Sequence, residues 1–431
     1  MLNILTKENN RFFIHQPRGK QPGALDSILL LLLLTSILFF PFIPLSSSFF
    51  FSLEEVVVVL IGARLLQKQF FWLDRYLFVI IAFAVYATVV IVINPNRTHL
   101  SEYFEVYKIL KYGTIYVFAI YYFLEERNHG AINKYLLVSF LILFFFNVMH
   151  YFNIIDFNKN ITILYDSDGR DVRSFGLNSI GQAGPKRIVG TMGNPNDNAI
   201  LFLFYFVYFQ YLSVTVHSNK NMLYRCCYYG AFLMIILCQS RTGIVATFVV
   251  FFAGFFMRSK TMESIKSYLI HLFVFVLLIA LLFSFEKEAG GMQYLRNTNV
   301  LNVGDNNSVR GRFEIWSYLI DMWMNKPVFG YGPNKEFMYS NFIYPENEYI
   351  FYLWRYGIIG LIFYLLILFI PAALLLRAKP INKFIIPFLL MLLTIALANN
   401  PFSNPKFLII IALIIGYCVS LYYKKQQKAD E

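Results

Sequence analysis

Long apolar runs separated by short polar stretches are the dominant pattern along this chain. Residues 27–45 and 268–285 are two such runs, and neither contains an Asp, Glu, Lys or Arg. A run of ~18 or more apolar residues is long enough for a helix to cross a bilayer. Because such runs recur throughout the sequence, we predict one membrane domain over residues 1–431, although the length alone would suit about two or three soluble domains.

The length and hydropathy of these runs predict about twelve membrane-spanning helices. The predicted fold class is therefore all-α, a polytopic integral membrane protein. Glu54 and Glu55 interrupt the start of the second span. The predicted spans cover residues 27–45, 49–66, 75–93, 103–124, 132–150, 198–215, 222–238, 243–258, 267–285, 347–370, 382–399 and 406–423.

Lysine and arginine outnumber aspartate and glutamate by 37 to 25, which gives a net charge of +12. Such a charge suits a nucleic-acid partner, but membrane proteins also concentrate Lys and Arg in cytoplasmic loops. If the N-terminus is cytoplasmic, the short cytoplasmic loops are basic, whereas the short opposite loops hold little beyond Arg97, Arg241 and Lys406. We therefore expect both termini in the cytoplasm and no nucleic-acid partner. No small-residue cleavage site follows the first run, so we expect it to remain as a span.

Two extramembrane segments are long, and this orientation places both on the side opposite the cytoplasm. They cover residues 150–197 and 286–345. Long loops cross the membrane largely regardless of their charge, so their basic residues do not contradict the orientation. Loops longer than ~15 residues are usually functional or disordered. We therefore expect the functional groups on this side of the membrane.

The second long loop contains a predicted amphipathic helix. Phe313, Trp316, Ile320 and Trp323 recur at three- and four-residue spacing, which gives one apolar stripe. Such a stripe suits a helix that lies on the membrane surface. It suits a helix packed on other helices equally well.

Charged residues inside the predicted spans are candidates for a functional site, because a charge inside a bilayer is costly. Lys108 and Lys111 share one face of the fourth span near its outer end. Arg355 lies about two turns inside the tenth span. Glu54 and Glu55 lie near the outer end of the second span, and the alternative is that these glutamates and lysines form internal ion pairs.

Three further arginines are expected on the same side of the membrane. Arg241 lies in a short outer turn, and Arg310 and Arg312 lie in the first turn of the amphipathic helix. Guanidinium groups stay charged and bind phosphate oxygens through paired hydrogen bonds. Arginines at the depth of lipid headgroups therefore suit a phosphate or diphosphate, and a polyprenyl-diphosphate lipid would place its tail between the helices.

Short motifs that combine glycines with polar residues lie on this side in a defined order. In chain order they are GNPN at 193–196, QSRTG at 239–243, GRFEIW at 311–316 followed by KPVFGYG at 326–332, and EN at 346–347 followed by GIIG at 357–360.

This ordered set resembles the O-antigen polymerase and O-antigen ligase superfamily over roughly residues 190–365. The resemblance implies an all-helical membrane glycosyltransferase of GT-C-like architecture. In such an enzyme an acceptor hydroxyl attacks the anomeric carbon of a glycan carried on a polyprenyl diphosphate. Arginines stabilise the leaving diphosphate, so the resemblance implies neither a metal nor a cofactor. The D-x-D of Asp166 and Asp168 is explained more simply as a turn than as a metal site.

The resemblance assigns catalytic roles to Arg241, Arg312 and Glu346. Arg241 matches the Ser-Arg-Thr-Gly turn and Arg312 the Gly-Arg motif, whereas Glu346 stands where the ligases have a His before Asn. A carboxylate within reach of the acceptor hydroxyl could take its proton as attack proceeds. The alternative role for Glu346 is that of a helix cap, because an acidic residue is favourable at a helix N-terminus.

A wider set of polar residues is expected to bind the substrate or support the site. They are Arg310, Arg355, Asn347, Asn196, Lys108 and Lys111. The implied substrates are undecaprenyl-diphosphate-linked oligosaccharides, and the implied protein partners are a flippase and a chain-length regulator.

The predicted function is that of a polysaccharide polymerase, which joins lipid-linked repeat units on the periplasmic face of the inner membrane. The first alternative is an O-antigen ligase, which transfers the glycan to lipid A-core; Glu346 in place of the ligase His argues against it. The second is a flippase or transporter, for which internal repeats and midplane polar sites are typical. The two halves of the chain show no such repeat, and the charges gather on one side. A chain-length regulator would have few spans and one large periplasmic domain.

Overall fold

The computed structural model describes residues 13–15, 21–41, 43–44, 50–94, 99–125, 127–165, 187–215, 221–257, 262–285, 307–341, 343–376, 378 and 381–430. Each predicted span overlaps a helix within these residues. The longer helices are α1 (Ala24–Phe39), α2 (Leu53–Lys68), α3 (Arg75–Ile93), α4 (Leu100–Phe123), α5 (Arg127–Phe152), α7 (Pro195–Thr215), α8 (Asn221–Leu237), α9 (Arg241–Phe256), α10 (Met262–Phe285), α12 (Asn307–Met324), α14 (Glu348–Leu375), α15 (Asn382–Ile395) and α16 (Pro405–Asp430).

The remaining elements are short. The helices α6 (Phe157–Asn160) and α13 (Lys335–Ser340) lie in the two predicted long loops. Strand β1 (Phe13–His15) pairs antiparallel with β4 (Phe71–Leu73), and β2 (Ile43–Pro44) pairs antiparallel with β3 (Phe50–Phe51). These ribbons lie at the ends of helices and add no sheet layer to the fold.

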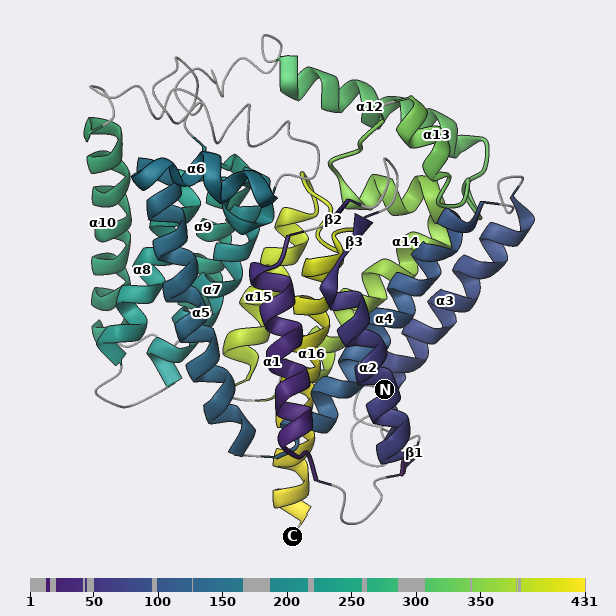
Figure 1. Ribbon diagram of the computed structural model, residues 1–431, viewed down its shortest axis with the longest axis horizontal. Coiled ribbons are helices and arrows are strands. Elements are labelled where there is room, and N and C mark those ends of the chain that lie inside the picture. The colour runs from purple at the N-terminus through teal and green to yellow at the C-terminus, as the bar shows by residue number, and fades with distance from the viewer. Residues whose placement is uncertain are drawn as a thin grey trace.

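The long helices lie side by side in one bundle, and α12 and α13 lie across one end of it (Figure 1). The C-terminus lies at the opposite end. Two contacts bring the starts of α7, α14 and α16 together near α12. The Asn404 side-chain amide donates to Asp197 at 3.1 Å, and the Glu348 carboxylate accepts from the backbone N–H of Ser403 at 2.9 Å.

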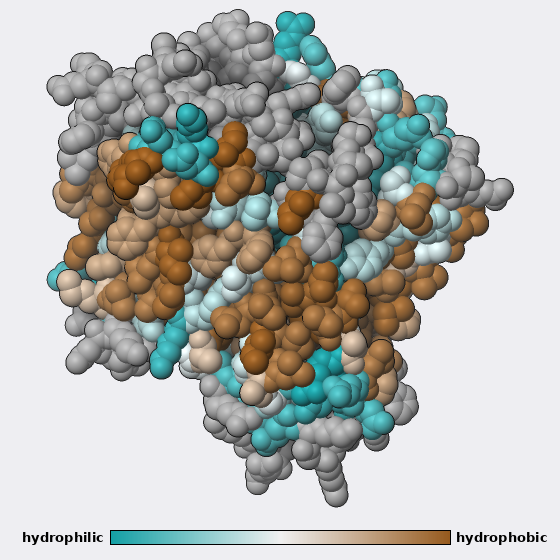
Figure 2. All heavy atoms as spheres, viewed as in Figure 1, coloured by the Kyte–Doolittle hydropathy of each residue, from teal (hydrophilic) through white to brown (hydrophobic). Residues whose placement is uncertain are grey.

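Five helices are long and apolar enough to cross a membrane: α3, most of α5, α7, α14 and most of α16. Shorter apolar helices are α1, α8, α9, the Tyr268–Ala280 part of α10, and α15. Figure 2 shows apolar residues around the middle of the bundle and hydrophilic residues toward both ends. The chain is therefore an all-α, multi-pass membrane protein. In the described part of the chain, α2 and α4 meet neither criterion, so the number of twelve spans remains a prediction.

Helix α7 lies at the centre of its half of the bundle. Nearly all of its side chains are buried, and Phe202, Phe206 and Phe209 are fully covered. The ring of Phe206 stacks on Tyr228 of α8 with their centroids 4.4 Å apart. Such a helix, apolar on every face, is expected for a span enclosed by other spans rather than by lipid.

Helix α14 is broken at Gly357, close to the end that carries α12. Gly357 has φ 64° and ψ −167°, a conformation that is essentially restricted to glycine. A Cβ on this residue would lie 2.1 Å from the carbonyl oxygen of Val328. The GIIG motif therefore begins with a glycine that the backbone geometry requires.

The segment 327–332, most of the KPVFGYG motif, satisfies the backbone groups that the break exposes. A break at membrane depth is tolerated only where the protein itself provides such partners. The two motifs therefore form one interlocked unit. Its hydrogen bonds run from Tyr331 N–H to Trp354 O at 3.0 Å, from Gly332 N–H to Arg355 O at 2.8 Å, and from Ile358 N–H to Pro327 O at 2.9 Å.

Replacing Gly357 by alanine should destabilise the protein by at least about 2 kcal/mol, because both the dihedral angles and the Val328 carbonyl exclude a methyl group. The measurement is thermal unfolding of the purified protein in detergent. The matched control is Gly130→Ala in α5, where a Cβ would meet nothing within 4 Å. Equal unfolding temperatures for the two variants would contradict the interlock.

Candidate active site at the α12 end of the bundle

Helix α12 covers the segment predicted to be amphipathic, and its one buried side chain among the described residues, Leu319, lies outside the predicted aromatic stripe. Leu319 is fully buried, whereas Phe313, the first residue of the stripe, is 53% exposed. The packed cluster consists of Leu319, Met338, Ile343, Phe351 and Trp354, with Ile315 and Met322 against it.

Two of the three predicted catalytic residues lie together. The Arg312 guanidinium forms an ion pair with the Glu346 carboxylate. The two side chains are 30% and 42% exposed, so the pair is open to solvent on one side. Gly311, next to Arg312, has open space where a side chain would project. The arrangement places a guanidinium and a carboxylate side by side on partly exposed side chains.

The segment that carries Glu346 is held on both sides against the connection between α15 and α16. The Asn347 side chain caps α14 by accepting from Ile350 N–H at 3.1 Å, and its amide donates to the Leu397 carbonyl at 3.1 Å. Asn400 donates to the carbonyl of Pro345 at 2.8 Å. The cap of α14 is therefore Asn347, and the alternative that Glu346 caps the helix is wrong.

Glu348 was not predicted as part of the site, yet it also holds the Glu346 segment against the connection between α15 and α16. Its carboxylate is fully buried and accepts from Phe402 N–H at 3.2 Å, Ser403 N–H at 2.9 Å and the Tyr364 hydroxyl at 3.2 Å. The backbone N–H of Glu348 also donates to Ala396 O at 2.9 Å. Because its neighbours are fixed, the position of the Glu346 backbone is well defined while its side chain stays half-exposed.

Arg241 begins helix α9 in the tight turn of the QSRTG motif. Ser240 is the N-cap of α9, and its hydroxyl accepts from Gly243 N–H at 3.3 Å. A Cβ on Gly243 would lie 3.2 Å from Ala199 of α7, so this glycine allows α9 to approach α7 closely. The turn therefore has a defined backbone geometry that positions Arg241 at the start of its helix.

Arg187 connects this turn to the GNPN motif, and the sequence alone did not identify it. Its guanidinium donates to the Cys238 carbonyl at 3.1 Å and to the Asn196 side chain at 2.9 Å, and it is 5% exposed. Ile188 N–H adds a bond to the Leu237 carbonyl at 3.4 Å. Arg187 thus bridges Asn196, which was predicted as a supporting group, and Cys238, which directly precedes the QSRTG motif.

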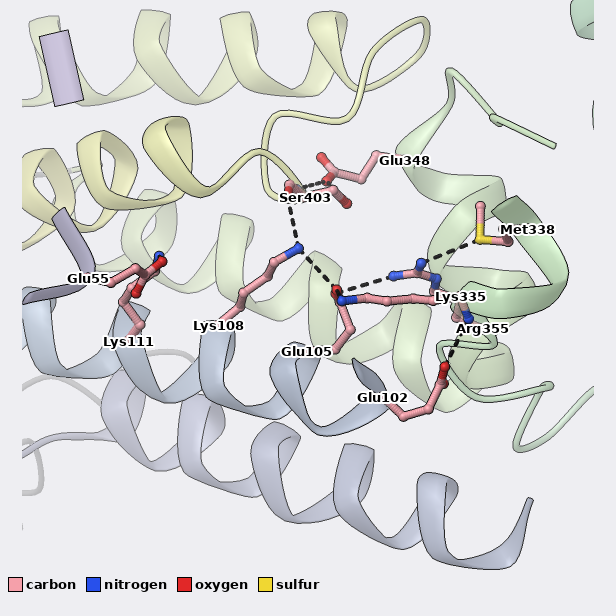
Figure 3. Close-up of polar contacts among 10 residues, drawn as sticks. All are labelled: Glu55, Glu102, Glu105, Lys108, Lys111, Lys335, Met338, Glu348, Arg355 and Ser403. Carbon is pink, nitrogen blue, oxygen red and sulfur yellow. Dashed lines mark hydrogen bonds and ion pairs between the residues drawn. The ribbon is translucent and has the colours of Figure 1, made fainter. Parts of the chain in front are cut away.

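Buried charges form a second cluster around Glu105 of α4 (Figure 3). The Glu105 carboxylate lies 3.0 Å from Lys108, 2.9 Å from Lys335 of α13 and 3.2 Å from Arg355 of α14. Lys108 also donates to the Ser403 carbonyl at 3.2 Å. The structure therefore brings together two predicted residues, Lys108 and Arg355, around a carboxylate that was not predicted.

Other charges in this region are held by internal partners. Glu102 accepts from the backbone N–H groups of Asn334 and Lys335 at 2.6 and 2.9 Å, which fixes the start of α13 to α4. Lys111 is almost fully buried and pairs with Glu55 at 2.5 Å. The alternative of internal ion pairs is therefore confirmed for Lys111.

Arg310 takes a different place from the other predicted substrate-binding residues. It pairs with Glu314 one turn along α12 at 2.9 Å, and both side chains are about two-thirds exposed, at 70% and 65%. This pair therefore lies on the outer surface of α12. Asp166 and Asp168, considered above as a turn, lie outside the described residues.

Replacing Glu105 by glutamine should cost roughly 3–5 kcal/mol of stability, because three cations would lose their shared carboxylate in a buried site. Thermal unfolding in nanodiscs would measure the change. The control is Glu314→Gln, which breaks an exposed pair and should cost less than about 1 kcal/mol.

A second substitution separates lost charge balance from lost shape. Glu105→Gln combined with Lys335→Gln should recover part of the stability, because one uncompensated cation is removed. If the double variant recovered no stability, charge balance would not be what stabilises the cluster of Lys108, Lys335 and Arg355 around Glu105, here called the Glu105 hub.

Residues 228–365 match the family model described as O-antigen ligase. The match includes Arg241, Arg312, Glu346 and Arg355, and it confirms the predicted resemblance to the O-antigen ligase and polymerase superfamily. No curated protein matches the chain.

Proposed function

We propose that this membrane protein, with its O-antigen ligase family segment, is a polysaccharide polymerase that joins lipid-linked oligosaccharide repeat units. The observation that carries the proposal is the meeting of Arg312 with Glu346 at the end of the bundle. A cation for a leaving diphosphate and a carboxylate for an incoming hydroxyl are the two groups that such a transfer needs. The donor is an oligosaccharide on undecaprenyl diphosphate.

The reaction forms one carbon–oxygen bond, breaks another and transfers one proton. The acceptor hydroxyl oxygen bonds to the anomeric carbon of the donor glycan, and the bond from that carbon to the diphosphate oxygen breaks. Glu346 takes the proton of the hydroxyl, and the negative charge that develops on the diphosphate is stabilised by Arg312 and Arg241. The transfer of the glycan and the proton is thus balanced in atoms and charge with these residues alone.

We place this site on the periplasmic side of an inner membrane. The support is the excess of Lys and Arg in the loops predicted to lie at the other end, together with the placement of α12 opposite the C-terminus. Lipid-linked glycans present their diphosphate at the headgroup depth, where the starts of α9, α12 and α14 would lie. Both termini would then be cytoplasmic, and a flippase and a chain-length regulator would be the expected partners.

The ligase is the second candidate, and the description of the matching family model favours it. The carboxylate of Glu346 in place of the ligase histidine favours the polymerase. A flippase gains no support from the family match, and the gathering of charges at one end suits an enzyme better than a carrier that serves both sides.

Deletion of the gene should leave lipopolysaccharide that carries core plus a single repeat unit. Wild-type protein should restore the ladder, whereas Arg241→Ala, Arg312→Ala and Glu346→Gln should each reduce long chains at least about tenfold, because each removes a group of the proposed transfer. The measurement is a lipopolysaccharide gel, with membrane levels checked by immunoblot. Glu336→Gln is the control, since this α13 carboxylate is exposed and pairs with His99.

The gel also separates the two candidate functions. Bare core with long polymer accumulating on its lipid carrier would identify the ligase. A ladder that does not change on deletion would overturn both lipopolysaccharide functions.

Glu346→His should retain part of the ladder, whereas Glu346→Gln should not, because imidazole can accept a proton near neutral pH and an amide cannot. The same gel, at matched membrane levels, measures the difference. Equal loss in both variants would mean that the carboxylate does not act as a base.

A further inference from the structure

The two groups proposed for the reaction neutralise each other in the structure. Arg312 and Glu346 are joined as an ion pair, so the guanidinium is not fully available to a diphosphate. The Glu346 carboxylate is likewise occupied by the guanidinium, so it is not free to accept a hydrogen bond from an acceptor hydroxyl. Neither group is therefore ready for catalysis while the pair is closed.

We propose that this ion pair is a donor-operated lock: the diphosphate of the donor displaces Glu346 from Arg312 and thereby frees the carboxylate to act as the base. The inference rests on the proposed function and adds an order to it. The base becomes available only after the donor has bound.

The balance of charge favours this exchange. A diphosphate carries more negative charge than one carboxylate and can bind a guanidinium through two hydrogen bonds. The pair to be broken is partly solvated, with side chains 30% and 42% exposed, and such pairs are weak. The Glu105 hub differs, since its carboxylate is 10% exposed and shared by three cations.

The surroundings allow the side chains to separate without moving the helices. Leu319 fixes α12 on α14, and Asn347 and Glu348 fix the segment that carries Glu346. Only the two side chains need to turn. A Cβ on Gly311, the residue before Arg312, would meet nothing within 4 Å, so no neighbouring atom crowds the helix backbone there.

The test is the affinity of the full-length protein in nanodiscs for undecaprenyl diphosphate. Glu346→Gln should bind it about two- to fivefold more tightly than wild type, because the competitor for Arg312 is gone. Glu336→Gln removes an exposed carboxylate of α13 that pairs with His99 and should leave the affinity unchanged. Unchanged or weaker binding by Glu346→Gln would overturn the lock.

A double-mutant cycle separates the lock from simple relief of charge repulsion. In an Arg312→Ala background, Glu346→Gln should no longer improve binding, because no guanidinium remains to be released. An equal gain in both backgrounds would overturn the lock and leave the proposed function standing. Failure of the wild type to bind, or no loss with Arg312→Ala alone, would instead count against the proposed function.

Discussion

The interlock between the break in α14 and the segment 327–332 is the constraint on which the α12 end of the molecule depends. Gly357 interrupts the helix, and the backbone of the preceding loop supplies the missing hydrogen-bond partners. Inside a bilayer such partners are obligatory, so the loop and the helix can exist only together. The loop in turn connects α12 and α13 to α14, which places Arg312 within reach of Glu346.

The charges near this end fall into two physical classes. The Glu105 hub and the Lys111–Glu55 pair are largely buried and join separate helices, so they stabilise the packing of those helices. The Arg312–Glu346 pair is partly exposed to solvent and lies on side chains whose backbones are held by other contacts. Burial thus distinguishes charge that holds the structure from charge that is available for exchange with a ligand.

Most of the long helices could be predicted from sequence because they are long apolar runs, and Arg312 and Glu346 could each be predicted as site residues because they lie in motifs that resemble one superfamily. Their ion pair could not, because the two residues are far apart in the sequence. The Glu105 hub could not, since its cations come from α4, α13 and α14 and the residue spacing contains no sign of their meeting. The burial of Leu319 in α12 could not be predicted either, because aromatic periodicity does not show which side of a helix fits a neighbour. The capping role of Asn347, likewise, depends on backbone angles that a motif does not encode.

The anchoring of Glu346 extends beyond the segment that matches the family model. The residues next to Glu346 form hydrogen bonds with residues 396–403, the segment that connects α15 to α16. The match to the family model ends before it, at residue 365. The family motifs are therefore not a transplantable unit. A chimaera that exchanged the last two helices for those of a relative would keep every motif residue and still lose the surface against which the carboxylate is set. Divergence in that C-terminal pair is thus a route by which the position of the Glu346 segment could change without altering a single motif residue.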